Sequence, residues 1–426
     1  MSDFDIKLPD GRVLKQSLIK NSIEYQNEIL ALKAKFNTPP HCLCNTEFEN
    51  KLVIKQRGSK IFLAAWPGSG CMHNMICQHY NEAPDGLTGK SLITKGAKIE
   101  KLGRVYISCL VTLTHREKAE SSSDGASNAG AEKEPKEGKE AGETEGKRKI
   151  GLLELFYEFW MGAQLHQHAP GAEARRNWVH IRDKIADFTR NIYVNKVSMA
   201  EGLYIPFAFS KEHIEKIEKE KEKFFQPWRG EKNKDLLVIG ELKDIEQNDH
   251  GWTVKLRHES YPLYMTEQQF ETMRSHFKFP LSIFEEKQRS GRDIGKIMII
   301  AACNMPSKYL TVRSIAMVGV SHEYIPASSM NELKLIHKLI GEKRSFFRPA
   351  KFLLDSTDTA DYVLVDTPSE TMLAIYDSEV PEYDSYKNTK MLNLKSLKYN
   401  TWNWFPGEAT EIPELPQPFT PESAEA

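Results

Sequence analysis

Long apolar runs are missing from this sequence. No stretch approaches the roughly 20 apolar residues that a membrane-spanning helix needs. Residues 1–6 have neither the basic start nor the hydrophobic stretch of a secretory signal. We therefore expect a cytoplasmic protein with no membrane partner.

Cysteine and net charge are also scarce. The 426 residues include six cysteines, and Cys109 and Cys303 lie alone in apolar segments, which argues against a disulfide framework and indicates a reducing compartment. The formal net charge is −1, so no global basic field attracts nucleic acid. A nucleic-acid partner would have to be met by a local patch.

What the N-terminal part does contain is a concentration of cysteine and histidine. Cys42 and Cys44 follow a Pro-Pro-His run, and Cys71, His73 and Cys77 lie together further along the chain. Zn²⁺ prefers four sulfur or nitrogen ligands in a tetrahedron, and two short clusters can supply two each. The spacing therefore predicts a zinc site, with free buried thiols as the simpler alternative.

Two ligand sets satisfy the pattern. Cys42, Cys44, Cys71 and His73 form Cys-x-Cys…Cys-x-His, the pattern of a SWIM zinc finger, which is a module associated with nucleic-acid and protein binding. The second set replaces Cys71 by Cys77 and gives Cys-x-Cys…His-x-x-x-Cys, whose second half has the more usual spacing. We prefer the second set, with Cys71 as the alternate.

The segment between the two clusters explains why a metal would be useful there. Residues 51–55 and 61–65 are short, β-branched runs joined through Arg57-Gly-Ser, which is typical of a hairpin. A ribbon this small buries little, so a metal at its open end would stabilise it. No glutamate lies beside the ligands to act as a base, and we expect a structural site.

Composition divides the rest of the chain. Residues 119–149 contain almost nothing that could join a core and predict a disordered linker. The expected organisation is a zinc-binding β-rich module (1–117), the linker (118–149), a helical segment (150–230), a strand-rich α/β domain (231–410) and a disordered tail (411–426).

The C-terminal part has an order of elements that is familiar from one enzyme class. A helix over 328–340 carries Glu332 in its first turn, a strand over 359–367 contains Asp361, and a second strand (371–377) precedes a lysine-rich helical start (382–390). This order resembles the PD-(D/E)XK, or restriction-endonuclease-like, core, which we place at about 320–400.

In that family, carboxylates and a lysine gather around Mg²⁺, which polarises the phosphodiester. The resemblance implies Glu332 as the helix acid, Asp361 as the strand acid, and Lys387 or Lys390 as the lysine. One position departs, because Ala374 occupies the place of the second-strand acid, and Asp377 or Asp366 would have to replace it. The resemblance therefore implies a nuclease-like fold more strongly than it implies DNA cleavage.

Several motifs together resemble a wider family. They are the Cys-x-Cys pair, the Trp-Pro-Gly-Ser-Gly…His…Cys segment (66–80), Leu-Phe-Tyr-Glu-Phe-Trp (155–160), Arg-Arg-Asn-Trp (175–178) and Asp-Tyr-Val-Leu-Val-Asp-Thr (361–367). They resemble an uncharacterised bacterial domain-of-unknown-function family with N-terminal cysteines, often carried on plasmids and integrative elements. The resemblance implies a mobile-element setting, with transfer or defence proteins as partners, and no specific activity.

The sequence therefore predicts an α+β multidomain protein with an N-terminal zinc-bound β-ribbon, a helical middle and a C-terminal restriction-endonuclease-like domain. The favoured function is nucleic-acid binding, with DNA contacted by the zinc module and by a lysine face of Lys387, Lys390, Lys395 and Lys398. Two alternatives are a Mg²⁺-dependent DNA endonuclease and a non-enzymatic protein-interaction scaffold.

Overall fold

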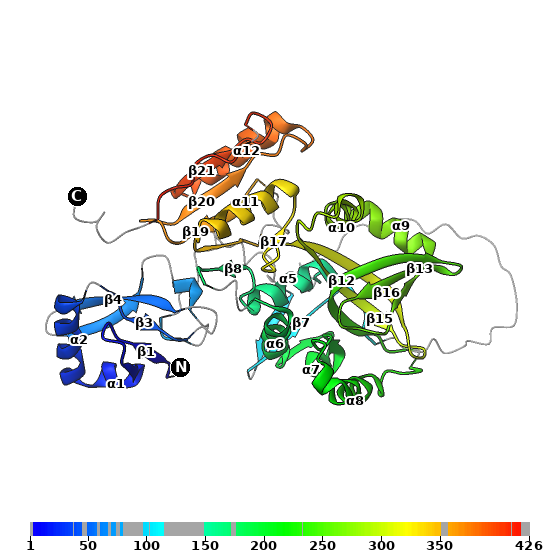
Figure 1. The fold of residues 1–426 in the computed structure, drawn as a ribbon, viewed down its shortest axis with the longest axis horizontal. Helices are drawn as coiled ribbons and strands as arrows, with labels where there is room; N and C mark the ends of the chain where they lie inside the picture. The colour runs from blue at the N-terminus through cyan, green and yellow to red at the C-terminus, as the bar shows by residue number, and fades with distance from the viewer. Residues whose placement is uncertain are drawn as a thin grey trace, which may run out of the picture.

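The computed structural model describes residues 3–36, 38–44, 49–57, 60–66, 70–73, 77–79, 97–101, 103–114, 149–171, 176–231, 233–350, 357–409 and 411–418. Figure 1 shows an N-terminal module at one side, a β-barrel at the other and a C-terminal α/β unit above them. The mixed α/β class is confirmed. Almost all of the predicted linker lies outside the described residues. No described helix is both long enough and apolar enough to cross a membrane.

The N-terminal module is a small sheet covered by helices. Its elements are β1 (Asp5–Lys7), β2 (Val13–Lys15), α1 (Gln16–Asn21), α2 (Ile23–Lys35), β3 (His41–Cys42), β4 (Asn50–Arg57), β5 (Lys60–Ala65) and the 3-10 turn η1 (Gly70–Met72). The strand order is β2-β1-β3-β4-β5. The predicted hairpin is confirmed, because β4 and β5 are antiparallel with Leu52 opposite Ala65. Ile6, Ile29 and Leu52 lie in its core.

A helical layer with short strands follows. It contains β6 (Lys98–Lys101), β7 (Arg104–Ile107), α5 (Leu152–Gly162), β8 (Gln167–His168), α6 (Trp178–Thr189), β9 (Ile192–Val194), β10 (Val197–Ser198), α7 (Met199–Gly202), β11 (Leu203–Tyr204), the 3-10 turn η2 (Lys211–His213) and α8 (Ile214–Phe225). Strand β7 pairs in parallel with β9, and Ile107 and Leu113 share a core with α5 and α6. Residues 103–114 therefore pack with this layer, although the sequence placed them in the zinc module.

The barrel occupies the middle of the chain. Its elements are β12 (Leu236–Asn248), β13 (Gly251–Leu256), β14 (Leu263–Met265), α9 (Glu267–His276), α10 (Lys278–Ser290), β15 (Lys296–Asn304) and β16 (Leu310–Val320), followed by the short β17 (Pro326–Ala327). The sequence pattern predicts a hairpin of strands over 296–303 and 309–318 and a helix over 266–277. The β15–β16 pairing and helix α9 confirm both. The strand-like runs 235–240 and 252–257 also predict a pair of strands joined by a turn at 248–251. This pairing is wrong, because residues 236–241 of β12 pair with β15 and only the later part of β12 pairs with β13.

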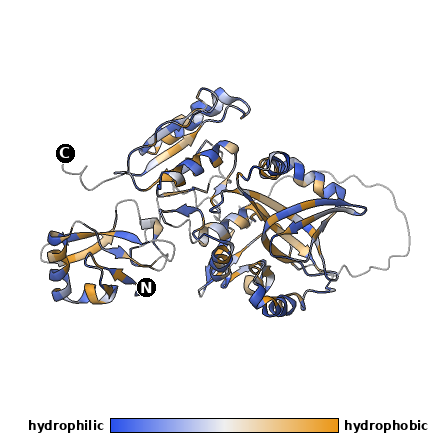
Figure 2. Cartoon of the chain, in the orientation of Figure 1, coloured by the Kyte–Doolittle hydropathy of each residue, from blue (hydrophilic) through white to orange (hydrophobic). Residues whose placement is uncertain are grey.

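That division of β12 closes the sheet on itself. The order is β12-β13-β14-β16-β15, and β15 returns to β12. Strands β14 and β16 run parallel, and the other pairs are antiparallel. Figure 2 shows orange, hydrophobic strands around the barrel core. Val238, Val254 and Leu310 point into this core, and Phe270 of α9 and Leu281 of α10 join it.

Only part of the barrel's outer surface is covered. Leu237 and Ile239 of β12, Ile300 of β15 and Val318 of β16 belong to the same cluster as Phe156 of α5 and Ile181 of α6. Since successive strand residues point to opposite faces, these strands are buried on both sides. No residue of β13 or β14 belongs to that outer cluster.

The C-terminal unit is a sheet between two helices. Its elements are α11 (Met330–Gly341), β18 (Phe346–Phe347), β19 (Tyr362–Leu364), β20 (Thr371–Ile375), α12 (Tyr383–Ser396) and β21 (Asn400–Trp404). The order is β21-β20-β19-β18-β8, with β20 and β21 parallel. Tyr362 clusters with Leu339 of α11, and Val363 with Leu394 of α12. The two helices therefore cover opposite faces.

The predicted disordered tail is partly wrong. Leu415 is buried in the core that includes α11 and β21, and the indole N–H of Trp402 donates to the carbonyl of Glu414 at 2.9 Å. Residues 411–418 are therefore anchored to the core through Ile412 and Leu415, because apolar side chains follow the last strand closely enough to reach it.

Candidate metal centre and other candidate sites

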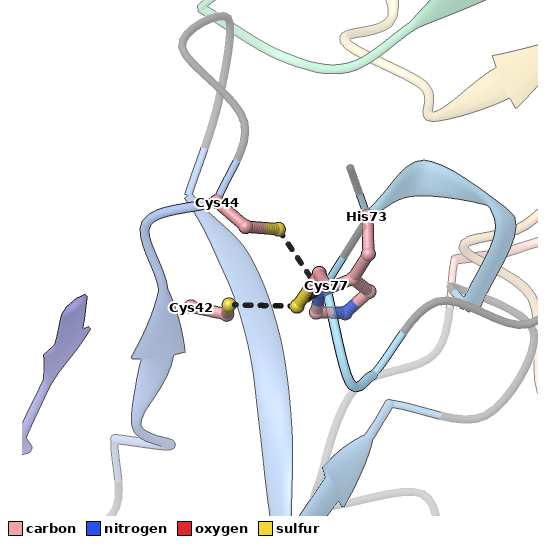
Figure 3. A group of neighbouring side chains, drawn as sticks. All are labelled: Cys42, Cys44, His73 and Cys77. Atoms are coloured by element: carbon pink, nitrogen blue, oxygen red, sulfur yellow. Dashed lines mark hydrogen bonds between the residues drawn. The ribbon is translucent and has the colours of Figure 1, made fainter. Parts of the chain in front are cut away.

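Local structure brings four ligand-type residues of the N-terminal module together. Strand β3 ends at Cys42, which lies opposite Ile6 of β1, and Cys44 follows two residues later. His73 comes directly after η1, and Cys77 is four residues further on. All four side chains are buried, and Figure 3 shows them pointing toward one another.

The separations within this group match those of a tetrahedral metal site. The Sγ atoms of Cys42 and Cys77 are 3.7 Å apart, and Nδ1 of His73 lies 3.3 Å from Sγ of Cys44 and 3.8 Å from Sγ of Cys77. Around zinc, bonds of about 2.3 Å to sulfur and about 2.0 Å to nitrogen place two sulfurs about 3.8 Å apart and sulfur and nitrogen about 3.5 Å apart. The ligand atoms all lie within 4.8 Å of one another, and this group could hold a metal ion.

The structure gathers the preferred ligand set, with Cys77 as the fourth residue. The side chain of Cys71, the alternate ligand, lies outside the described residues. Hydrogen bonds from Cys42 and Cys44 lower the pKa of the Cys77 thiol, and the bonds to Cys44 and Cys77 raise that of Cys42. The group therefore already favours a thiolate, which is the form that binds metal.

Neighbouring groups fix the ligands in place. The side-chain amide of Asn50 donates to the carbonyl of Met72 at 3.1 Å and approaches Sγ of Cys44 at 3.8 Å. The backbone N–H of His79 donates to Sγ of Cys77 at 3.5 Å. Burial lowers the pKa of His79 to about 4, so its imidazole adds no positive charge beside the cluster.

The η1 turn and His73, which follows it, also contact the rest of the molecule. The side-chain amide of Gln164, which follows α5, donates to the carbonyl of His73 at 2.8 Å. Met72 is buried in the same cluster as Phe347, Val363 and Met372 of the C-terminal sheet. The loop that carries one ligand therefore connects the N-terminal module to two other units.

In the C-terminal unit, two of the predicted catalytic residues are in contact. Oδ2 of Asp361 accepts hydrogen bonds from Nζ of Lys390 at 2.8 Å and from the backbone N–H of Ile375 at 2.6 Å. Lys390 also donates to the Ile375 carbonyl at 2.9 Å and to the Tyr386 hydroxyl at 3.1 Å. Asp361 and Lys390 are both fully buried.

Glu332 does not join them. Its Oε2 accepts from Nη2 of Arg348 and the hydroxyl of Tyr362, each at 3.2 Å. Burial alone would lower the pKa of Arg348, yet the charge of Glu332 raises it, and the guanidinium stays protonated. Because Tyr362 and its neighbour Asp361 point to opposite faces of β19, Glu332 and Asp361 lie on opposite sides of the sheet.

The remaining nuclease candidates have other partners. Lys387 pairs with Glu408 at 2.9 Å and lies over the ring of Phe405. Asp366 accepts two hydrogen bonds from Arg344, and Asp377 accepts one from Asn331. Since Lys390 is buried, the predicted phosphate-binding face of four lysines is not a continuous surface.

A further exposed site on the barrel escaped the sequence analysis. Tyr264 of β14 and Tyr309, in the loop before β16, are 37% and 39% exposed, and their rings meet edge to face at 5.3 Å. Tyr264 lies between Leu263 and Met265, which are buried. The alternation of apolar Leu263 and Met265 with Tyr264 in the sequence could have indicated that the tyrosine ring faces outward.

The chain belongs to the family described as "Protein of unknown function (DUF1173)", whose model matches residues 12–407. The predicted membership of an uncharacterised domain-of-unknown-function family is thereby confirmed. The match includes the metal-ligand group, the barrel and most of the C-terminal unit. No curated protein and no solved structure matches the chain.

Elemental analysis tests the metal centre. We expect wild-type protein to contain one bound zinc per chain and Cys42→Ser to lose most of it, because three ligands no longer close the tetrahedron. Cys109→Ser, which changes a buried cysteine outside the group, should keep the metal, and so should Cys71→Ser. Full occupancy in Cys42→Ser would contradict this site, and retention in Cys77→Ser with loss in Cys71→Ser would favour the alternate ligand set.

Proposed function

We propose that the protein binds single-stranded nucleic acid across β13, β14 and the start of β16, while its N-terminal cysteine and histidine group holds a structural zinc. The observation that carries the proposal is the connectivity of the barrel together with the exposed tyrosine pair on its uncovered side.

The connectivity is that of the oligonucleotide- and oligosaccharide-binding (OB) barrel. Numbered within the barrel, its strands follow the order 1-2-3-5-4 and close back to strand 1. The third and fifth strands are parallel, and helices lie between the third and fourth. OB barrels bind their ligands on the face of strands 2 and 3 and with the adjacent loops. The corresponding strands here are β13 and β14.

Coverage of the barrel leaves this face available. Helices α5 and α6 pack on the outside of β12, β15 and the later part of β16. The outward residues Lys255 and Tyr264 are partly exposed, and Thr311 lies next to Tyr264 across the β14–β16 pair. The face named by the OB comparison is therefore also the one that the fold leaves uncovered.

The chemistry of the face suits an unpaired strand. Strands β13, β14 and β16 contain no acidic residue, so nothing on them repels phosphate. Arg313 is the extra residue at a β-bulge in β16, and bulges often re-aim a side chain at a binding site. Its side chain is 53% exposed and lies 3.8 Å from the carboxylate of buried Asp235. Lys255 and Lys308 add positive charge, although Lys255 pairs with Glu246 in the later part of β12.

Stacking explains the preference for single strands. Tyr264 and Tyr309 offer aromatic surface to bases, and such stacking requires bases that are not already paired in a duplex. Few cations line the face, so stacking should supply much of the affinity. The formal net charge of −1 is consistent with binding in which stacking contributes more than charge.

The zinc is assigned a structural role because four protein ligands leave no open coordination position. Three thiolates and an imidazole favour Zn²⁺ over the hard ions Mg²⁺ and Ca²⁺. Its contribution would be to hold the η1 loop, and with it Met72, against the C-terminal sheet.

The C-terminal unit supports a scaffold role better than cleavage. Its order α11-β18-β19-β20-α12-β21 and the Asp361–Lys390 contact favour the nuclease-like fold as a second candidate. Three observations weigh against an active Mg²⁺ site: Asp361 is fully buried, Glu332 lies across the sheet, and Ala374, opposite Asp361, offers no ligand. The mobile-element setting and its transfer or defence partners stay predictions from the family resemblance.

Substitution of the tyrosines tests the binding face. Tyr264→Ala and Tyr309→Ala should each weaken binding of a fluorescent oligothymidylate by about 1–3 kcal/mol, the usual loss for one stacked base. Because the rings touch, the double variant should lose less than the sum. Anisotropy titrations at two salt concentrations measure both effects.

The matched control is Phe209→Ala, which removes a ring that is 59% exposed but lies in the segment before η2. It should bind like wild type. The binding face is excluded if the tyrosine variants and the control bind equally well, or if duplex DNA binds as tightly as the single strand.

The buried ion pair gives a separate prediction. Asp361→Ala leaves the Lys390 ammonium buried and unpaired, which should destabilise the protein by about 3–5 kcal/mol in urea unfolding. Asp361→Leu combined with Lys390→Met removes both charges and should recover much of that loss. Supercoiled plasmid with Mg²⁺ or Mn²⁺ should not be nicked by wild type, whereas nicking by wild type that the folded Asp361→Leu, Lys390→Met double variant lacks would establish the endonuclease alternative.

A further inference from the structure

A cavity of about 710 Å³ lies among α6, α7, α8 and the segment that leads into β12. Its volume is within the range of about 300–1,000 Å³ that is usual for small-molecule sites. The cavity lies apart from the proposed nucleic-acid-binding face, because no residue of β13 or β14 lines it. The wall is mainly apolar, with contributions from Met199, Leu203 and Ile205.

Aromatic rings form a large part of this wall. Phe207, Phe224 and Trp228 line the cavity together with Tyr204. Phe207 and Phe224 are only partly buried, so each keeps some ring surface that a ligand can contact. A planar aromatic ligand gains most from such a wall, because flat rings stack on one another.

Cations outnumber acids around the cavity. Arg182, Arg190, Lys223 and Lys234 line it, against Glu201 and Glu220. Arg190 and Lys234 have exposed acidic partners, Asp187 and Glu231. Lys223 forms no ion pair within the described chain. Lys223 is therefore the cation of the lining that remains available to an anionic ligand.

Arg182 contributes a specific hydrogen-bond donor. Its guanidinium lies 3.9 Å from the centroid of the Phe207 ring, and Nη1 donates to Asp183 at 2.8 Å. Its Nε–H is buried and has no hydrogen-bond partner among the residues that the structure describes. A buried donor without an acceptor costs free energy, and an anionic oxygen in the cavity could accept from it.

We propose that this cavity binds a nucleoside 5′-phosphate, with the base against the aromatic wall and the phosphate near Arg182 and Lys223. The same chemistry is offered by a free mononucleotide and by the 5′ end of a single strand. The site is distinct from the barrel face and does not depend on nucleic-acid binding there.

Calorimetric titration of the full-length protein tests the proposal with AMP and with adenosine, which lacks the phosphate. AMP should bind and adenosine should bind at least about tenfold more weakly, because charge-assisted hydrogen bonds are lost. A 5′-phosphorylated and a 5′-hydroxyl oligothymidylate form the second arm. Preference for the phosphorylated end without AMP binding would identify a strand end as the ligand, and AMP binding would identify a free nucleotide.

Variants of α8 and α7 link binding to the cavity. Lys223→Glu should weaken phosphate-dependent binding about tenfold or more, and Glu220→Lys should strengthen it. Lys219→Glu makes the same charge change on the same helix outside the lining and should have no effect. Ala200→Trp places an indole at the wall and should abolish binding.

Unfolding midpoints of all variants should stay near the wild-type value, because these positions are exposed. The proposal is overturned if neither AMP nor a 5′-phosphate is preferred over its uncharged counterpart. It is also overturned if Lys223→Glu and Ala200→Trp bind like wild type.

Discussion

The division of β12 between two partners is the constraint on which the rest of this structure depends. Its first half pairs with β15 and its second half with β13, which closes the barrel. Leu236 and Val238 fill the interior while Leu237 and Ile239 pack under α5 and α6. The helical layer is thereby fixed to one side of the barrel. Among the described residues no helix packs on the outer side of β13 and β14, which is why the proposed ligand face lies there.

Polar groups and the N-terminal cysteine and histidine group organise the units outside the barrel. The η1 loop carries His73 to the N-terminal ligand group and Met72 to the C-terminal sheet. Within that sheet, Asp361–Lys390 connects β19 to α12, and Glu332–Arg348 lies on the α11 side. Buried pairs contribute little net stability, but they penalise arrangements that separate the partners. Here they would specify where each helix packs.

Local patterns in the sequence predicted the local structure. The β4–β5 and β15–β16 hairpins, helices α9 and α11, and the four-residue ligand group follow from short-range spacing. Barrel closure depends on the pairing of β14 with β16 and of β12 with β15, which no local period encodes. The helical period alone does not separate Lys387 from Lys390, because each has a tyrosine four residues before it and an apolar residue four residues after it. Only the packing of α12 on the sheet, which buries Leu394 and leaves Met391 exposed, identifies Lys390 as the buried lysine.

The central claim is that unpaired bases stack on the tyrosines of the barrel face. Photo-crosslinking with an oligonucleotide that contains 5-iodouracil tests it most directly, because mass spectrometry of the crosslinked peptides identifies the residue in contact with each base. The account predicts adducts at Tyr264 and Tyr309. Adducts confined to the N-terminal module or to α12, with none on β14 or the β15–β16 loop, would contradict it.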